Sequence, residues 1–305
     1  MATSKSRKLA RKWRALNNVY FLRMVLGSPF RILFGNDAGL RENIEGRQKI
    51  KLAKNRGDNK YIYDKRVIEL KRSGFLTIGY PFSKEFISKI KAAYLSQIRI
   101  KEEAIGKSDA TEVKPALLHV PDLKLLLMEA PEISNLLRSY YGGGFFEIMR
   151  IDAWRNYSWG AKGLTKDINS NLFHNDQART DILKVFILLS DNVSRSNGAT
   201  RIFSIGTTKK IMRSGFIQRK IILWPASRIT KNDDQVNYME GDTGFTFVFN
   251  PQLALHAAGL VSESKYRDVI CISVKSSEIP IIDDWDQLIV AQDLAFMEKH
   301  NVAVI

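Results

Sequence analysis

The chain has 305 residues, and its shares of hydrophobic and charged residues, 45% and 26%, are typical of a soluble globular protein. Its single cysteine, Cys271, excludes a disulfide framework within the chain, so we expect a reducing, cytoplasmic compartment. Most of the net charge of +15 lies in residues 1–72, which hold 19 Lys and Arg against 6 Asp and Glu. Because the remainder is nearly neutral, the charge favours neither nucleic acid as a partner nor an anionic substrate.

The first segment, residues 1–36, is strongly basic and carries apolar residues at roughly helical spacing. This pattern predicts a basic amphipathic helix. Charged residues and Pro29 interrupt the apolar stretch, which argues against a transmembrane span and a secretory signal. Three interpretations stay open: a helix that packs on its own domain or on a partner, a helix on the surface of an anionic membrane, and an organellar targeting peptide.

Residues 42–60 are polar and charged, and they include Gly46 and Gly57. This composition predicts a linker or mobile loop. The expected organisation is therefore a basic amphipathic extension with its linker at 1–60, followed by one globular domain at 61–305.

The first half of the globular domain has helical patterning. Gly74 is placed to end one helix, Ser83 can cap the start of the next, and three glycines from Gly142 stop the last. The expected helices are 63–73, 84–95, 122–130 and 132–141, with a short strand at 75–78.

The second half consists of short runs rich in Ile, Val and Phe, mostly separated by Gly, Asn, Asp or Pro. Strands at this spacing favour a sandwich, jelly roll or barrel over alternating βαβ units. Cys271 lies inside one of these runs and is expected to be a small buried core residue. The expected strands are 145–157, 182–189, 200–205, 218–223, 245–249 and 268–274, and a helix at 284–299 follows them.

Two histidines and one acid have the spacing of a metal site. His174 and Asp176 are two residues apart, so in an extended segment both side chains point to the same face and can reach one ion. His256 follows the strand at 245–249, and Arg267 comes eleven residues later. Two His and one carboxylate leave three coordination positions open, as in oxygen-activating Fe(II) sites. A 2-oxoglutarate can take two of these and O2 the third, and an arginine suits the far carboxylate of the cosubstrate.

Further segments extend this pattern. Ser73-Gly74-Phe75-Leu76 precedes the helix at Ser83, Asn197-Gly198 turns into the next strand, and Gly241-Asp242 leads to Asn250-Pro251 and His256. With these motifs, the chain from Gly74 to Ser276, about two-thirds of its length, resembles the phytanoyl-CoA dioxygenase family. The resemblance implies an α+β fold with a mainly β core, a double-stranded β-helix of the jelly-roll type flanked by helices. It also implies Fe(II) and 2-oxoglutarate as cofactors, O2 as cosubstrate, and hydroxylation coupled to release of succinate and CO2.

The chain departs from this family at two places. The stretch Ser204–Thr208 replaces the family's Pro-Gly-Ser-His, and the gap before His174 is long and polar. Both departures are expected at the substrate mouth, so the namesake substrate is not expected here. The retained acid, Asp176, favours hydroxylation over halogenation, which in related enzymes uses a small residue at that position.

Six other residues are candidates for contacts with cosubstrate or substrate. Arg150, Arg155 and Asn156 lie on the strand that precedes the metal segment, Trp159 and Phe173 can line the pocket, and Thr200 follows the Asn-Gly turn. The other two histidines, His119 and His300, lie outside any metal spacing.

The leading interpretation is a dioxygenase that hydroxylates a C–H bond of a small molecule, lipid or sugar-like metabolite. One alternative keeps the cofactors but leads to desaturation, cyclisation or epimerisation. Another is a non-catalytic β-fold binding protein that its basic N-terminus attaches to membrane or nucleic acid. The complete set of three ligands and one arginine favours the enzyme.

Overall fold

The fold is described from a computed structural model. The described residues are 40–56, 63–105, 110–113, 116–157, 172–176, 179–213, 232–262 and 265–277. The expected N-terminal helix, the strand at 218–223 and the helix at 284–299 lie outside these ranges. None of the described helices is long and apolar enough to serve as a membrane span.

Two antiparallel sheets form the centre of the described part of the chain. The larger sheet has the strand order β1-β7-β4-β9-β3-β2 and the smaller one the order β6-β5-β8. The strands of the larger sheet are β1 (Phe75–Gly79), β7 (Thr246–Phe249), β4 (Leu183–Leu188), β9 (Tyr266–Ser277), β3 (Phe145–Tyr157) and β2 (Ala110–Val113). Those of the smaller sheet are β6 (Val236–Met239), β5 (Thr200–Phe203) and β8 (His256–Ala257).

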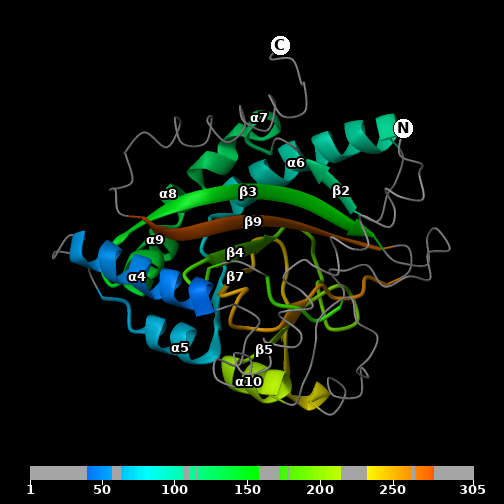
Figure 1. Cartoon of the computed structure of the whole chain (residues 1–305). Helices are drawn as coiled ribbons and strands as arrows, with labels where there is room; N and C mark the ends of the chain where they lie inside the picture. Colours follow the sequence, from blue (N-terminus) through cyan, green and yellow to red (C-terminus); the bar gives the residue numbers. More distant parts are fainter. Residues whose placement is uncertain are drawn as a thin grey trace, which may run out of the picture.

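Helices cover the outer face of the larger sheet, as Figure 1 shows for α6 and α7 above the long pair β3 and β9. The short helix α10 packs beside β5, on the side of the sheets opposite to α6 and α7. The helices are α4 (Leu40–Arg56), α5 (Arg66–Ser73), α6 (Lys84–Ile105), α7 (Ala116–His119), α8 (Leu126–Glu129), α9 (Pro131–Tyr140) and α10 (Ile205–Arg213), with 3-10 turns η1 (Pro121–Leu125) and η3 (Asp233–Gln235).

The helix ends follow the sequence signals. Gly74 ends α5 with a φ of 86° and donates its N–H to the carbonyl of Leu70, a left-handed cap that favours glycine. The hydroxyl of Ser83 accepts a hydrogen bond from the N–H of Phe86 at the start of α6. This helix runs ten residues past its expected end at 95, because the buried face continues through Ile98.

The side chains of β4 alternate between two hydrophobic cores, one on each face of the larger sheet. The odd-numbered residues Leu183, Val185 and Ile187 pack with the helices, whereas Phe186 and Leu188 pack between the two sheets. Cys271 belongs to this inner core and is 1% exposed, as expected, and burial raises the pKa of its thiol to about 12.

A β-bulge in β3 decides which of its side chains face the inner space. The register with β9 shifts between Ile148 and Arg150, so the residues that pack with the helices change from even to odd numbers. Beyond the bulge, Ile151 and Ala153 join the helix-side core. The even-numbered residues from Arg150 to Asn156 therefore face the space between the sheets.

The linker prediction for residues 42–60 is wrong for residues 42–56, which belong to α4. This helix lies against β9 and β3. A Cβ at Gly46 would lie 2.3 Å from the Thr180 hydroxyl, so glycine permits the helix to approach the domain closely. Composition alone suggested a linker because the helix is polar overall, and its docking depends on one small residue.

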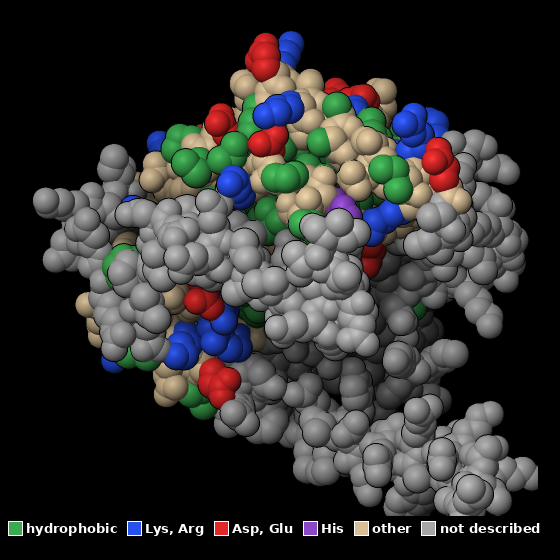
Figure 2. All heavy atoms as spheres, turned by 90° about the horizontal axis from the view of Figure 1, so that it is seen from above, with side chains coloured by type: hydrophobic (Ala, Val, Ile, Leu, Met, Phe, Trp, Pro, Cys, Tyr) green, Lys and Arg blue, Asp and Glu red, His purple; other side chains and the backbone are tan. Residues whose placement is uncertain are grey.

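The described surface over the helices carries charges of both signs. Figure 2, which views this face from above, shows Lys and Arg interspersed with Asp and Glu. Such mixing is typical of a solvated surface and agrees with the nearly neutral composition beyond residue 72.

Candidate metal centre

The three predicted metal ligands come together at one point. Asp176 Oδ1 lies 3.6 Å from His174 Nε2 and 3.7 Å from His256 Nε2, and one ligand atom from each residue lies within 4.8 Å of the others. The backbones of His174 and His256 pair directly, each donating its N–H to the other's carbonyl at 2.9 Å. This bridge holds the two imidazoles side by side, with ring centroids 4.3 Å apart.

Both histidines have the tautomer that a metal ligand needs. His174 Nδ1 lies 2.7 Å from the carbonyl of Leu172, and His256 Nδ1 lies 3.2 Å from that of Ala254. A carbonyl only accepts, so each Nδ1 carries a proton, and Nε2 is the nitrogen that can bind a metal when the ring is neutral. Two neutral imidazoles and one carboxylate fit Fe(II).

The carboxylate of Asp176 is ionised and anchored. Burial would raise the pKa of Asp176, but His256, when its ring is protonated, and the ammonium of Lys184 lower it to about 2. Its Oδ2 lies 2.6 Å from Lys184 Nζ, and its N–H donates to the carbonyl of Pro251. The acid is therefore available as a ligand at neutral pH.

Arg267 is a buried cation whose hydrogen bonds go to neutral oxygens. One Nη donates to the carbonyl of Gly198 at 2.8 Å and to the hydroxyl of Thr200 at 3.0 Å, and the other donates to Asn156 Oδ1 at 2.9 Å. No carboxylate among the described residues pairs with Arg267, and its Nε has no partner there. Burial lowers the pKa of Arg267 to about 10, so it stays charged at neutral pH and favours an anion beside it.

His174, His256 and Arg267 line one cavity of about 290 Å³ between the two sheets, and Asp176 lies beside the two imidazoles. Its wall contains Glu112, Arg150, Asp152, Trp154, Asn156, His174, Lys184, Phe186, Thr200, His256, Ala258 and Arg267. Nine of these twelve residues are charged or polar, whereas apolar atoms form the larger part of the wall's surface, so the cavity suits an occupant with both polar and apolar groups.

The structure places the secondary candidates differently. Arg150, Asn156 and Thr200 line the cavity, and Trp159 lies outside the described residues. Phe173 does not line the cavity, because its ring packs 4.7 Å from that of Phe203 in a separate apolar cluster. That expectation is corrected.

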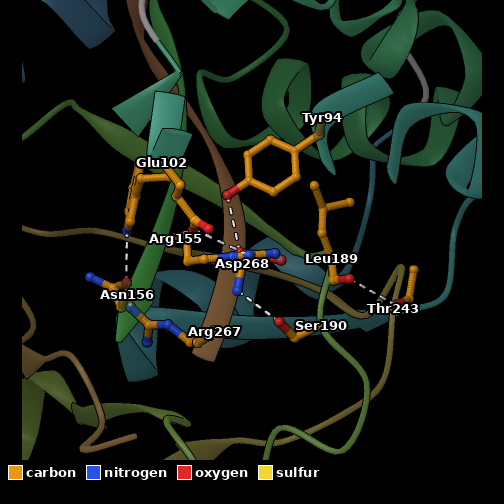
Figure 3. Close-up of polar contacts among 10 residues, drawn as sticks. Tyr94, Glu102, Arg155, Asn156, Leu189, Ser190, Thr243, Arg267 and Asp268 are labelled. Atoms are coloured by element: carbon orange, nitrogen blue, oxygen red, sulfur yellow. Dashed lines mark hydrogen bonds and ion pairs between the residues drawn. The ribbon is translucent and has the colours of Figure 1, made fainter. Parts of the chain in front are cut away.

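The expectation for Arg155 is also corrected, because Arg155 does not line the cavity and instead joins a buried polar network (Figure 3). Its Nε and Nη2 donate to the two carboxylate oxygens of Asp268 at 2.7 and 2.8 Å, and Tyr94 donates its hydroxyl to the same acid. Glu102 lies 3.4 Å from the guanidinium. Arg155 is therefore a structural residue that ties β3, β9 and α6 together.

The stretch Ser204–Thr208 does not line the cavity among the described residues. The hydroxyl of Ser204 accepts the N–H of Thr207 at the start of α10, and the hydroxyl of Thr208 accepts the N–H of Leu255. Ser204 therefore caps α10, and Thr208 holds the backbone of Leu255, the residue before His256. Among the described residues, this segment supports a metal ligand and does not line the cavity.

Lys184, Asp152 and Glu112 are cavity residues that sequence reasoning missed. Lys184 had one usable signal, since it is the only charged residue in the apolar strand β4. A lone lysine in a buried strand needs a specific partner.

Comparison with known proteins identifies the fold. No protein-family model and no curated protein sequence matches this chain. Among solved structures, EctD from S. alaskensis with 2-oxoglutarate and 5-hydroxyectoine is 14% identical, with 72% of this chain and 78% of that chain covered and a TM-score of 0.51. The chain has the double-stranded β-helix fold.

Two further structures are similar over the same share of this chain. AviO1 from Streptomyces viridochromogenes Tue57 is 14% identical, with 72% of this chain and 99% of that chain covered and a TM-score of 0.49. HygX from Streptomyces hygroscopicus, with nickel and 2-oxoglutarate bound, is 11% identical, with 72% and 89% covered and a TM-score of 0.48. At these identities the likeness concerns the fold, and the chemistry has to follow from the site.

Proposed function

We propose that this chain is an Fe(II)- and 2-oxoglutarate-dependent dioxygenase that hydroxylates a C–H bond of a small molecule and releases succinate and CO2. One observation carries the proposal. Two imidazoles meet one carboxylate, and the same two imidazoles line a cavity whose wall also holds Arg267, a buried cation without a carboxylate partner among the described residues. The two imidazoles and the carboxylate suit Fe(II), and Arg267 suits the far carboxylate of a keto diacid such as 2-oxoglutarate.

In this proposal each residue has a separate task. His174, Asp176 and His256 hold the metal on one side and leave the positions toward the cavity open. Arg267 orients oxoglutarate, and the hydrogen bonds from its Nη atoms to Gly198, Thr200 and Asn156 keep its guanidinium in place. Iron, when bound, supplies O2 activation with oxoglutarate as the source of electrons.

The cavity favours a small polar substrate over a long acyl chain. Its volume is about 290 Å³, and oxoglutarate takes part of that space. Glu112, Arg150 and Asp152 line it, and fixed charges are costly beside an apolar chain. Among the small-molecule, lipid and sugar-like classes, the sugar-like or other polar metabolites fit best. Membership of the phytanoyl-CoA dioxygenase family belongs to the same proposal, supported by the spacing of the ligands and Arg267.

Oxoglutarate turnover tests the proposal directly. The native chain with Fe(II) and O2 should convert 2-oxoglutarate to succinate, and a panel of polar metabolites should accelerate the conversion. Removal of the metal with a chelator should stop it, and added Fe(II) should restore it. A chain that binds Fe(II) but forms no succinate with any of the panel would instead be a binding module. Product analysis then separates hydroxylation from desaturation, cyclisation or epimerisation.

Arg267→Met is expected to weaken the binding of 2-oxoglutarate by roughly 10- to 150-fold, since a hydrogen bond to a charged group contributes about 1.5–3 kcal/mol. Isothermal titration of 2-oxoglutarate into the Co(II)-loaded chain measures this change without turnover. The control ligand is 2-oxobutyrate, which keeps the keto acid but lacks the far carboxylate and should bind the native chain and Arg267→Met equally weakly. An unchanged affinity for 2-oxoglutarate would remove Arg267 from the cosubstrate site.

A further inference from the structure

Lys184 is a half-buried cation beside the candidate metal centre. It lies on β4, where its even number places it on the inner face with Phe186 and Leu188, and its side chain is 18% exposed. Its Nζ lies 2.6 Å from Asp176 Oδ2. In the described part of the chain, Asp176 is the acid that pairs with it. Burying an ammonium costs several kcal/mol unless it is paired, so the pair holds Lys184 at the metal ligand.

The two oxygens of Asp176 have different surroundings. Oδ1 faces both imidazoles, at 3.6 and 3.7 Å from their Nε2 atoms. Oδ2 faces Lys184. The carboxylate therefore already has one oxygen directed to the metal position and one held by an ammonium group, which has no lone pair to bind a metal.

We propose that Lys184 is a positioning residue that keeps Asp176 a one-oxygen ligand, with Oδ1 on the metal and Oδ2 on Lys184. This inference rests on the proposed function. A carboxylate can bind a metal through one oxygen or through both. If Asp176 used both, its second oxygen would take one of the three positions that oxoglutarate and O2 require. Lys184 keeps that position open.

The ion-pair partners of the cavity cations distinguish the positioning role of Lys184 from the role of an oxoglutarate anchor. Arg267 is the buried cation without an acid partner among the described residues, whereas Lys184 has Asp176. Arg150 is a third cation on the wall, and its Nε lies 2.5 Å from Asp152, an acid outside the metal group. Lys184 and Arg150 thus differ in whether the paired acid is a metal ligand, and Arg150, whose side chain is 62% exposed, serves as the control for the loss of a positive charge from the same wall.

The experiment uses Co(II), whose visible absorption responds to the number and arrangement of its ligands. Spectra of the native chain, Lys184→Met, Lys184→Arg and Arg150→Met are recorded without oxoglutarate. We expect Lys184→Met to change the band shape and intensity, Lys184→Arg to resemble the native chain, and Arg150→Met to leave the spectrum unchanged. At saturating Co(II), Lys184→Met should lose affinity for 2-oxoglutarate, because the second oxygen of Asp176 would then compete for a position that the cosubstrate needs.

A native spectrum in Lys184→Met would overturn the inference. If that spectrum accompanied a lower oxoglutarate affinity, Lys184 would be a cosubstrate contact instead. Circular dichroism checks folding, and Lys184→Gln, which is shorter and uncharged but polar, replaces Lys184→Met with the same expected spectral change if the Met variant does not fold. A native chain that fails to bind Co(II) counts against the proposed function itself, so the two failures are distinct.

Discussion

Replacement of His174 by Ala is expected to abolish both metal binding and oxoglutarate turnover. The imidazole supplies one of three protein ligands, and its Nε2 faces Asp176 at 3.6 Å. A partner of a metal ligand typically contributes about 10- to 100-fold to affinity or activity, so we expect the loss of a ligand to exceed this. Titration with Co(II) measures the binding, and succinate formation with Fe(II) measures the turnover.

The fold should survive this substitution. The pairing of residue 174 with His256 uses backbone N–H and carbonyl groups, which alanine retains. His119→Ala is the control, because His119 lies at the end of α7 and outside the cavity. It should bind Co(II) like the native chain. Continued Co(II) binding and turnover in His174→Ala would place the metal elsewhere.

Asp268→Asn is expected to lower the free energy of unfolding by about 3–5 kcal/mol, the usual cost of removing one partner of a buried ion pair. The Asp268 side chain is 1% exposed and that of Arg155 is 10% exposed. Asparagine keeps the shape but loses the charge, which leaves the buried Arg155 guanidinium with Glu102 at 3.4 Å as its remaining ion-pair partner among the described residues. The hydroxyl of Tyr94, which also donates to Asp268, loses a charged acceptor (Figure 3).

Denaturant unfolding measures this change as a shift of the midpoint at constant slope. The matched control is Asp191→Asn, which breaks an ion pair of similar length, 2.8 Å to Lys91, but whose acid side chain is 57% exposed. Exposed pairs contribute about 0–1 kcal/mol, so the control should change little. Equal effects of the two substitutions would show that the buried network does not stabilise the fold.

The same network has a consequence for the site. Arg267 and Asp268 are consecutive in β9, so their side chains point to opposite faces of the sheet. The acid fixes the strand end to Arg155, while the arginine reaches the cavity. Stability on one face and cosubstrate orientation on the other therefore depend on the same strand end.

Local rules account for the part of the site that could be predicted. The spacing of His174 and Asp176 places both on one face of an extended segment, and His256 follows a recognisable strand. Most described strands and helices appear close to their expected ranges, since periodicity and caps are local properties. The polar helix α4 was not predictable, because its docking depends on the contact of Gly46 with Thr180.

The sequence by itself determined which side chains can do chemistry: two histidines, an acid and an arginine at metal-site spacing. Both Arg155 and Asn156 were candidates for the cavity, although alternation in a strand allows only one of two consecutive side chains to face it. Only the tertiary structure decided which of the two reaches the cavity, through the bulge in β3 and its register with β9. It likewise decided that Arg155 meets Asp268 and that Asn156 meets Arg267, across 113 and 111 residues of chain. Such contacts depend on the pairing of distant strands, which no short stretch of sequence specifies.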